Sequence, residues 1–408
     1  MDIRPILSTL LRHKTAAGLI VLEIALSCAI ICNALFLISQ RIESVSRPSG
    51  IAEDELLVIR LSGIGPDENA DARTREDKAA LRAVPGVAGV TMVNQMPFSS
   101  SASNSGITLT PEQDRAALVA ATYQGDEAML RTLGIRLRSG RDFRPDEFMD
   151  ATALEQVTDY STLSSPTIVS AATAERLFPG ENALGRTIYL GPVPLTIIGV
   201  AEALARPNDA GTGDMTHSLI LPIRDNYASG ASYMVRVTDP ARRDEVLAAA
   251  VAALESVDAS RLVLDQKTYT EVRDRFFRSD LDMIVLLGVV CIALLVVTAL
   301  GIVGLASFWV QQRSKQIGIR RALGATRGQI LRYFQTENFV LATLGIVIGM
   351  LLAFGINQML MGRYELPRLP LAYLPVGAVA LWLLGQLAVL GPARRAASVP
   401  PAVATRSV

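Results

Sequence analysis

The residue types that carry out metal and phosphate chemistry are scarce in this sequence. His13 and His217 are the only histidines, so neither a three-ligand zinc site of the histidine type nor an HExxH helix can form. A phosphate-binding loop needs a lysine directly after a glycine, and none of the four lysines follows one. No G-x-S-x-G nucleophile elbow occurs either. We therefore expect a chain without catalytic activity, bound cofactor or metal.

The cysteines also favour packing over metal binding. Cys28 and Cys32 are four residues apart and share one face of a helix, as a metal-binding pair would. Both lie in an apolar segment, as does Cys291, and buried cysteines usually pack as small apolar side chains. The long region between the first two apolar segments has no thiol, so it is not a disulfide scaffold.

The charge balance argues against nucleic acid as a partner and points to a membrane. Lys and Arg number 39, as do Asp and Glu, so the formal net charge is zero and no global attraction to nucleic acid exists. Half of the residues are hydrophobic and the mean hydropathy is +0.33, although 19% are charged. The apolar residues must therefore be concentrated in a few segments.

Four apolar segments are long enough to cross about 30 Å of hydrocarbon as helices. We predict transmembrane helices at 16–39, 283–310, 337–361 and 371–391, one at the start of the chain and three at the end. The first is interpreted as an uncleaved anchor, because a signal peptide has a shorter apolar core and a small-residue cleavage site. Residues 1–15 are predicted to form a helix along the inner membrane surface, in contact with lipid.

Basic residues flank these segments on one side of the membrane. They precede the first helix, fill the loop 311–336 between the second and third helices, and follow the fourth helix in the tail 392–408. The positive-inside rule therefore places both termini and this loop in the cytoplasm. The region 40–282, which has an excess of acidic residues, is predicted to lie on the far side of the membrane.

The region 40–282 has the pattern of a large mixed α/β domain. A strand, an amphipathic helix and a strand follow one another in about 53–95, and the same order returns in about 219–270. We interpret these βαβ halves as an internal duplication that packs as one subdomain. The insertion between them, about 96–218, is β-rich, and its serine-rich stretch 99–105 is interpreted as a mobile surface loop.

Glu23 and Asn33 are polar residues inside the first apolar segment. Glu23 is costly in lipid, so it serves a function or a dimer interface, or else it is protonated and packed structurally. The sequence leaves these alternatives open. Asn33 is expected to hydrogen-bond a neighbouring helix.

The loop 311–336 is basic and amphipathic, and its sequence predicts a tight turn between two helices. The second membrane helix is expected to continue to Leu323, where Gly324 ends it. Thr326 and Gln329 have the spacing of a capping box that starts the next helix. One interpretation is a positively charged loop that only fixes the orientation of the helices in the membrane. The other is a rigid projection that a cytoplasmic partner binds in order to move both helices.

The segment QIGIRRALGAT, residues 316–326, resembles the signature of FtsX/MacB-type ABC transporter permeases, in which it contacts the ATPase subunit. Other stretches are similar to family patterns: LGIRLRSGRDF at 133–143, TAERLFPGENALG at 173–185 with IIGV at 197–200, and PARRA at 392–396. The resemblance covers nearly the whole chain, and it implies a bacterial inner membrane with the region 40–282 in the periplasm. It includes the topology of one helix, a large exported domain and three further helices.

The resemblance implies a set of residues that couple the permease to the ATPase: Gln316, Gly318, Ile319, Arg320, Arg321, Ala322, Leu323, Gly324, Ala325 and Thr326. Gln316 stands where the family often has Glu, and its amide can still hydrogen-bond. ATP and Mg are expected on a separate cytoplasmic ABC ATPase subunit, because this chain carries no fused ATPase domain.

The function that the resemblance implies is mechanotransmission. A second permease subunit, identical or different, would complete a dimer, and motion of the ATPases would drive the periplasmic domains. With a periplasmic adaptor, which the insertion contacts, and an outer-membrane exit duct, such a machine exports a small molecule or peptide. The alternatives are a lipoprotein-releasing permease and a membrane-anchored regulator of a periplasmic enzyme or sensor.

Overall fold

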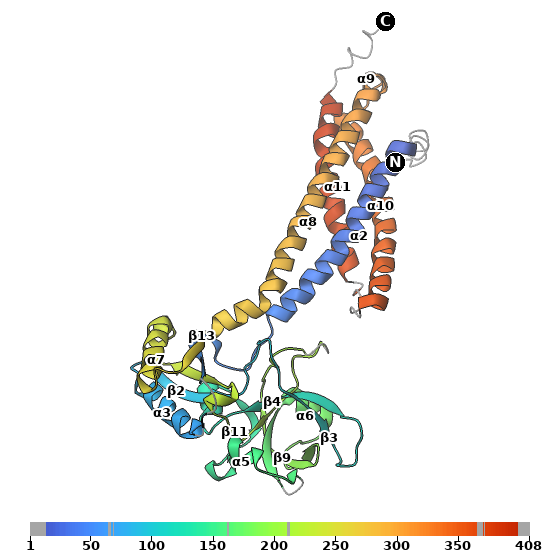
Figure 1. Cartoon of the computed structure of the whole chain (residues 1–408). Coiled ribbons are helices and arrows are strands. Elements are labelled where there is room, and N and C mark those ends of the chain that lie inside the picture. Colours follow the sequence, from blue (N-terminus) through green and yellow to red (C-terminus); the bar gives the residue numbers. More distant parts are fainter. Residues whose placement is uncertain are drawn as a thin grey trace. The chain divides into compact units, whose positions relative to one another are not determined.

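The computed structural model describes residues 14–63, 67, 69–160, 163–209, 213–364, 370 and 372–398, with only the backbone at 360–364. The helix expected at 1–15 lies almost wholly outside these residues, as does the end of the tail. The chain divides into two units, Arg47–Arg278 and Met1–Ser46 with Ser279–Val408. Figure 1 shows both units.

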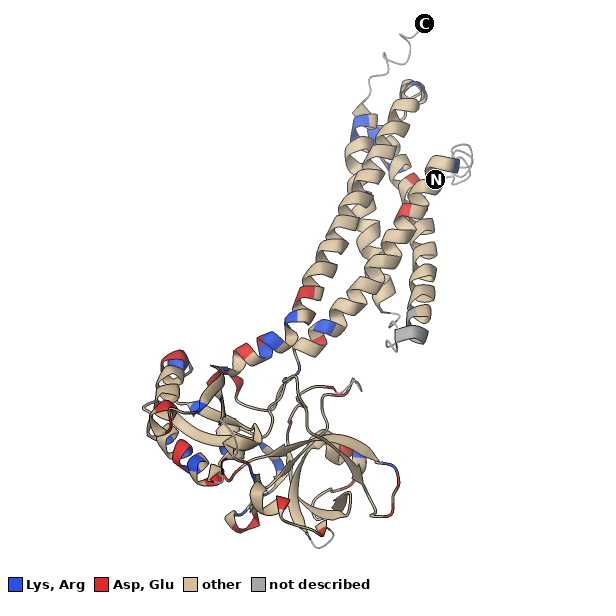
Figure 2. Cartoon of the chain, in the orientation of Figure 1, with Lys and Arg blue, Asp and Glu red and all other residues tan. Residues whose placement is uncertain are grey.

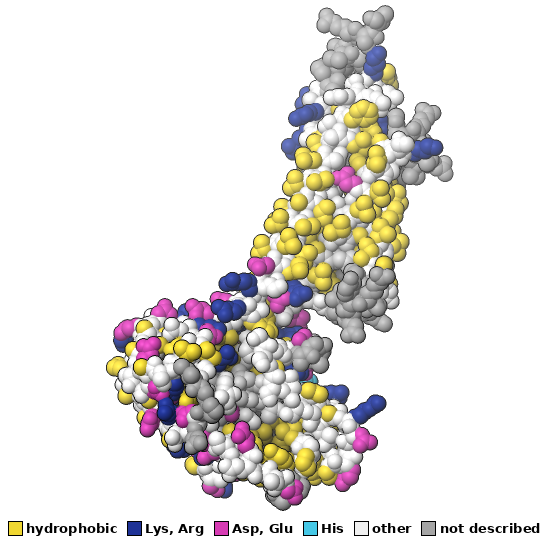
Figure 3. All heavy atoms as spheres, viewed as in Figure 1, with side chains coloured by type: hydrophobic (Ala, Val, Ile, Leu, Met, Phe, Trp, Pro, Cys, Tyr) yellow, Lys and Arg dark blue, Asp and Glu magenta, His cyan; other side chains and the backbone are white. Residues whose placement is uncertain are grey.

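Four helices in the described residues are long and apolar enough to cross a membrane: α2 (Lys14–Val45), α8 (Tyr269–Gln312), α10 (Arg327–Tyr364) and α11 (Tyr373–Ser398). α11 continues past 391 to Ser398, so the start of the expected tail is helical. The short helix α9 (Ser314–Ala322) lies between α8 and α10 in sequence. Figure 2 shows few charges along the middle of this bundle, and Figure 3 shows apolar side chains over most of its visible face. An apolar exterior of this kind is suited to lipid.

Small residues allow α2 and α10 to pack closely. A Cβ atom at Gly349 of α10 would lie 2.5 Å from the Cβ of Cys28, and one at Gly345 would lie 2.8 Å from the Cβ of Ile24. Gly345 and Gly349 form a GxxxG pattern, which brings membrane helices together. Cys32 packs against Gly377 of α11 in the same way. The cysteines are thus buried packing residues, and no group of three metal-binding side chains occurs in the described part of the chain.

A four-stranded antiparallel sheet combines both βαβ halves of the α/β unit. The halves are β1 (Leu56–Ser62), α3 (Ala70–Ala83) and β2 (Val87–Val93), and then β12 (Ser232–Val237), α7 (Arg243–Val257) and β13 (Leu262–Thr268). The strand order is β13-β1-β12-β2, so each half places a strand between the two strands of the other. The halves therefore form an interleaved, double split βαβ arrangement.

Each face of this sheet is buried by different elements. Leu57 of β1 and Tyr233 of β12 pack with Leu81 of α3 and Val246 of α7. Because successive side chains of a strand point to opposite faces, Val58 packs on the other side, in a cluster that includes α4 (Met129–Leu133). Short 3₁₀ turns connect the elements at Glu53–Glu55, Pro145–Glu147, Tyr227–Ser229 and Pro240–Arg242.

The insertion forms a second sheet of seven strands in the order β5-β9-β7-β10-β4-β3-β8. Its strands are β3 (Asn104–Thr108), β4 (Leu118–Gln124), β5 (Leu137–Gly140), β7 (Ser165–Ser170), β8 (Thr187–Leu190), β9 (Val193–Ala201) and β10 (Ser218–Leu221). A further pairing of β8 with β9 closes six of them into a barrel, filled by residues such as Ile107 and Leu219. Around it lie α5 (Ala151–Glu155), α6 (Ala171–Leu177) and the paired β6 (Met149–Asp150) and β11 (Ile223–Arg224).

Two expectations for the insertion are corrected by these pairings. The second βαβ half does not begin at 219, because β10 pairs with β4 and β7 of the barrel sheet. The stretch 99–105 is not a loose loop: the Ser99 N–H donates to the carbonyl of Pro207 at 2.8 Å, and the Ser103 N–H donates to Gln95 Oε1 at 2.6 Å. Local composition does not reveal such long-range hydrogen bonds.

Candidate functional site: the elbow between two membrane helices

The elbow, residues 311–336, begins with a break in the helix. α8 ends at Gln312, Arg313 has φ −102° and ψ 10°, and α9 starts at Ser314. The expectation that one helix continues to Leu323 is therefore wrong. The elbow instead contains a short separate helix, which is held on both sides.

A buried ion pair lies at this break. Arg313 Nη1 donates to both carboxylate oxygens of Glu337, at 3.0 Å each. The Arg313 guanidinium also lies over the Trp309 ring, 5.3 Å from its centroid, in a cation–π arrangement. Because Arg313 follows directly after α8 and Glu337 belongs to α10, the pair ties the two helices together beside the elbow.

The C-terminus of α9 is closed by a Schellman motif. Gly324 has φ 98°, a conformation that glycine adopts without the steric penalty of a Cβ atom. Its N–H donates to the carbonyl of Arg321 at 3.1 Å, and the Ala325 N–H donates to that of Arg320 at 3.0 Å. These two bonds satisfy carbonyls that the helix end leaves without partners. Gly324 thus ends α9, as the sequence predicts.

The next helix starts with the predicted capping box. The Thr326 N–H donates to Gln329 Oε1 at 2.9 Å, and the Gln329 N–H donates to Thr326 Oγ1 at 3.3 Å. This reciprocal pair satisfies two donors at the N-terminus of α10. With the Schellman motif, it fixes the backbone of the turn at both ends.

One side of α9 is anchored to its neighbours. Ile317 is buried with Phe334 of α10 and Ala393 of α11. Arg321 Nη1 donates to the backbone carbonyl of Ala397 at 3.0 Å, which adds a polar link to the end of α11. The elbow is therefore a packed part of the helical unit, with a fixed position relative to α10 and α11.

The opposite side of the elbow is open to solvent and mixes apolar with basic groups. Leu323 is 83% exposed and Ile319 is 55% exposed. The Arg320 guanidinium lies over the Tyr333 ring, 5.2 Å from the centroid. Figure 2 shows further basic residues at this end of the bundle. The other exposed members of the expected coupling set are Gln316, Ala322, Gly324 and Thr326.

The expected coupling residues therefore divide into two groups. Gly318 is buried, and Arg321 and Ala325 are half-buried. These residues pack within the elbow and offer little surface to a partner. Sequence reasoning missed the Arg313–Glu337 pair. The available indication was a pair of opposite charges at the ends of two predicted membrane segments, but their pairing depends on how the helices pack.

The polar residues of α2 face other helices. A Cβ atom at Gly301 of α8 would lie 2.5 Å from Glu23 Oε2, so this glycine makes room for the carboxyl group. Asn33 Nδ2 donates to the carbonyl of Ala353 in α10 at 3.2 Å. One turn from Glu23, the Ser27 and Thr298 hydroxyls are 2.8 Å apart. These contacts form a polar stripe along the helix interfaces.

Four spanning helices, a capped elbow between the second and third of them and a large α/β unit after the first define a multi-pass membrane protein with a large extracytoplasmic domain. Two family models match this chain: the MacB-like periplasmic core domain over residues 19–253 and the FtsX-like permease C-terminal region over 288–401. The first covers more than half of the chain. The chain belongs to the MacB/FtsX-like family of ABC transporter permeases.

Relatives of known sequence agree with this assignment. The chain is 24% identical to the uncharacterized ABC transporter permease YknZ of Bacillus subtilis, over 99% of this chain and 98% of that protein. It is 25% identical to the macrolide export ATP-binding/permease protein MacB of Acinetobacter baylyi, over 63% of this chain. The chain spans 40% of the length of that MacB protein. It is an ABC transporter permease of the MacB/FtsX type.

Solved structures of two relatives resemble the α/β unit. The extracellular domain of the transporter YknZ from Gram-positive bacteria is 18% identical, with a TM-score of 0.33, over 51% of this chain and 100% of that domain. The periplasmic region of MacB from Actinobacillus actinomycetemcomitans is 14% identical, with a TM-score of 0.33, over 57% of this chain and 97% of that region.

Proposed function

We propose that the elbow is the surface through which a separate cytoplasmic ABC ATPase subunit moves the permease. The observation that carries this proposal is Leu323, which is 83% exposed at the tip of a turn whose backbone is capped on both sides. With Ile319 it forms an apolar spot rimmed by basic groups. Exposed apolar spots with a polar rim mark interaction sites.

The fixed position of the elbow suits the transmission of force. Arg313 and Glu337 tie α8 to α10, and Arg321 ties α9 to α11, so a displacement of Leu323 acts on three helices together. α8 follows directly after β13 and continues to Gln312 without interruption. A push on the elbow therefore reaches the α/β unit through a single helix of 44 residues, about 66 Å long.

The orientation and the partners belong to the same proposal. Basic residues around the elbow and α11 favour a bacterial inner membrane with the elbow and both termini in the cytoplasm. ATP and Mg then bind the partner ATPase, and a second permease subunit completes the transporter. Two relatives are named for export, of macrolides by MacB and of pyoverdine by PvdT of Pseudomonas aeruginosa. We propose efflux of a small molecule or peptide through a periplasmic adaptor and an outer-membrane exit duct.

The proposal is tested by reconstituting the chain with its ATPase in nanodiscs and measuring ATP turnover. Leu323→Asp should weaken the complex by about tenfold or more, the effect of losing a buried contact residue. Charge reversal at Arg320 should act in the same direction. The matched control is Leu262→Asp, because Leu262 is 57% exposed on β13 and lies outside the elbow.

The outcomes separate the alternatives. Loss of complex formation with Leu323→Asp, but not with Leu262→Asp, supports coupling through the elbow. If the Leu323 variant still forms the complex with the ATPase and keeps full ATP turnover, the elbow only fixes the orientation of the helices in the membrane. A chain that binds no ATPase under any condition would instead fit a membrane-anchored regulator.

A further inference from the structure

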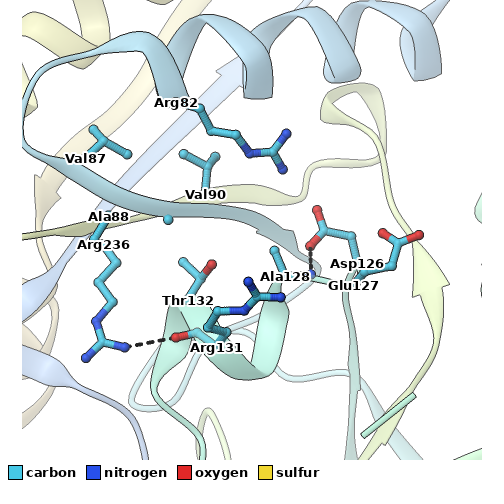
Figure 4. Close-up of a pocket in the computed structure, with 11 residues that line it drawn as sticks. Arg82, Val87, Ala88, Val90, Asp126, Glu127, Ala128, Arg131, Thr132 and Arg236 are labelled. Carbon is cyan, nitrogen blue, oxygen red and sulfur yellow. Dashed lines mark hydrogen bonds between the residues drawn. The ribbon is translucent and has the colours of Figure 1, made fainter. Parts of the chain in front are cut away.

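A cavity of about 560 Å³ lies within the α/β unit, between the four-stranded sheet and the start of the barrel subdomain. Its walls are the end of α3, the first residues of β2, the turn before α4, and α4 itself (Figure 4). The volume is within the range of small-molecule sites in proteins. Nothing in the coupling role of the elbow requires a cavity here.

Two arginines enter the cavity from opposite walls. Arg82 comes from the last turn of α3 and Arg131 comes from α4, and Figure 4 shows their guanidinium groups on the same side of the cavity as Asp126 and Glu127. Within the described part of the chain, neither guanidinium makes a hydrogen bond or an ion pair. Both are therefore available to an incoming group.

The acidic residues of the cavity are already engaged elsewhere. Asp126 is 4% exposed and accepts hydrogen bonds from Lys78 Nζ at 2.7 Å and Thr91 Oγ1 at 2.6 Å. Glu127 accepts from Arg224 Nε at 2.9 Å and Nη2 at 2.6 Å. Lys78 pairs with Asp126, and Arg224 is shared between Glu127 and Asp150. Asp142 lies close enough to interact with the charge of Arg131 but does not bond its guanidinium. The bonded acidic groups of the cavity therefore leave the donors of Arg82 and Arg131 unused.

The third arginine of the cavity helps to hold its wall. Arg236 Nε donates to Glu55 Oε2 at 2.6 Å, and Arg236 Nη1 donates to the backbone carbonyl of Arg131 at 2.9 Å (Figure 4). On the opposite side, Gly89 lets β2 approach α4, because a Cβ atom there would lie 2.9 Å from Thr132 Oγ1. The backbone that carries Arg131 is thus held in place before any ligand binds.

We propose that this cavity binds a small anionic solute, with a carboxylate or phosphate group held between Arg82 and Arg131. A guanidinium presents a planar fork of donors that matches both groups, and two such forks on facing walls can hold one anion from both sides. The site would give the permease a ligand-binding function in addition to force transmission.

The test uses the full-length chain in nanodiscs, with citrate and inorganic phosphate as probes in isothermal titration. We expect saturable binding of at least one probe, at one site per chain. Arg82→Gln and Arg131→Gln should each weaken that binding at least tenfold, and the double variant should abolish it. Arg82→Lys, which keeps the charge but loses the planar fork, should have an intermediate affinity.

A matched control and a folding check accompany the titration. Arg176→Gln changes another exposed arginine, on α6 and outside the cavity, and should bind the probes like the parent chain. Because both cavity arginines are exposed and unpaired, their variants should keep the thermal midpoint of the parent. The proposal is overturned if neither probe binds or if binding survives in the double variant.

Discussion

Arg313 Nη1 lies 3.0 Å from both carboxylate oxygens of Glu337, and the two residues are almost completely buried. Arg313 occupies the break between α8 and α9, whereas Glu337 lies inside α10. The pair therefore joins the two helices that the elbow connects, at the point where the first of them ends. It makes the elbow a stiff part of the bundle.

Removing one charge of this pair should destabilise the helical unit strongly. Glu337→Gln leaves the Arg313 guanidinium buried without a counter-charge, which costs about 3–5 kcal/mol. The thermal midpoint of the detergent-purified chain measures the effect. Glu245→Gln is the control, because its ion pair with Arg242 is exposed and such pairs contribute little. Equal midpoints for the two variants would contradict the structural role of the buried pair.

Gly324 should be sensitive to the smallest substitution. Its φ of 98° disfavours any residue with a Cβ atom, so Gly324→Ala should destabilise the elbow by about 1 kcal/mol or more. Gly328 lies four residues further on, inside α10 and with open space around a Cβ atom. There, Gly328→Ala should be neutral or stabilising, because alanine favours a helix. Hydrogen exchange of the elbow amides distinguishes the variants, and equal exchange would contradict the Schellman motif.

The close packing of α2 and α10 predicts a similar contrast. Gly349→Ala places a methyl group 2.5 Å from the Cβ of Cys28, and such overpacking costs about 1–3 kcal/mol. Gly355→Ala, six residues further along α10, meets nothing within 4 Å and should gain helix propensity. Thermal unfolding in detergent compares the two. A Gly349 variant as stable as the Gly355 variant would show that the helices do not approach so closely.

Asp225 predicts a pH dependence of stability. Burial raises the pKa of its carboxyl group to about 6, and a hydrogen bond from Ser229 offsets only part of this effect. An unfolded chain has an aspartate pKa of about 3.9, so the folded state binds the proton more tightly. The stability that protonated Asp225 contributes is complete below about pH 4 and is lost as the pH rises through 6.

Asp225→Asn should therefore raise the free energy of unfolding at pH 7 by about 1–2 kcal/mol, after allowance for partial exposure, and should leave it unchanged below pH 4. Asp258 is the control, because its pKa is shifted in the opposite direction. Hydrogen bonds from Ser260, and then the charge of Arg73, lower the pKa of Asp258. Asp258→Asn should therefore lose stability above pH 4. Thermal midpoints between pH 4 and 7.5 that move alike in both variants would contradict this assignment.

The sequence predicted the features that depend on nearby residues. The apolar segments that became α2, α8 and α10 are evident from composition alone, because a helix needs only enough consecutive apolar residues to cross the bilayer. The capping box of Thr326 and Gln329 and the stop at Gly324 are likewise determined within a few positions.

The features that were missed depend on residues far apart in the chain. Val58 of β1 pairs with Met234 of β12, and this register makes the βαβ halves interleave. At the break between α8 and α9, Arg313 pairs with Glu337, which lies 24 positions further along the chain. No local pattern encodes which of several charges will meet once the helices have packed.

Coupling through the elbow requires a contact between Leu323 and the ATPase subunit, and site-specific photo-crosslinking tests that contact directly. A photoreactive amino acid replaces Leu323, or Leu262 as the control, in cells that also produce the ATPase subunit. We expect a permease–ATPase crosslink from position 323 and none from position 262. A crosslink to the ATPase from neither position, or from position 262 alone, would contradict the assignment of the elbow as the coupling surface.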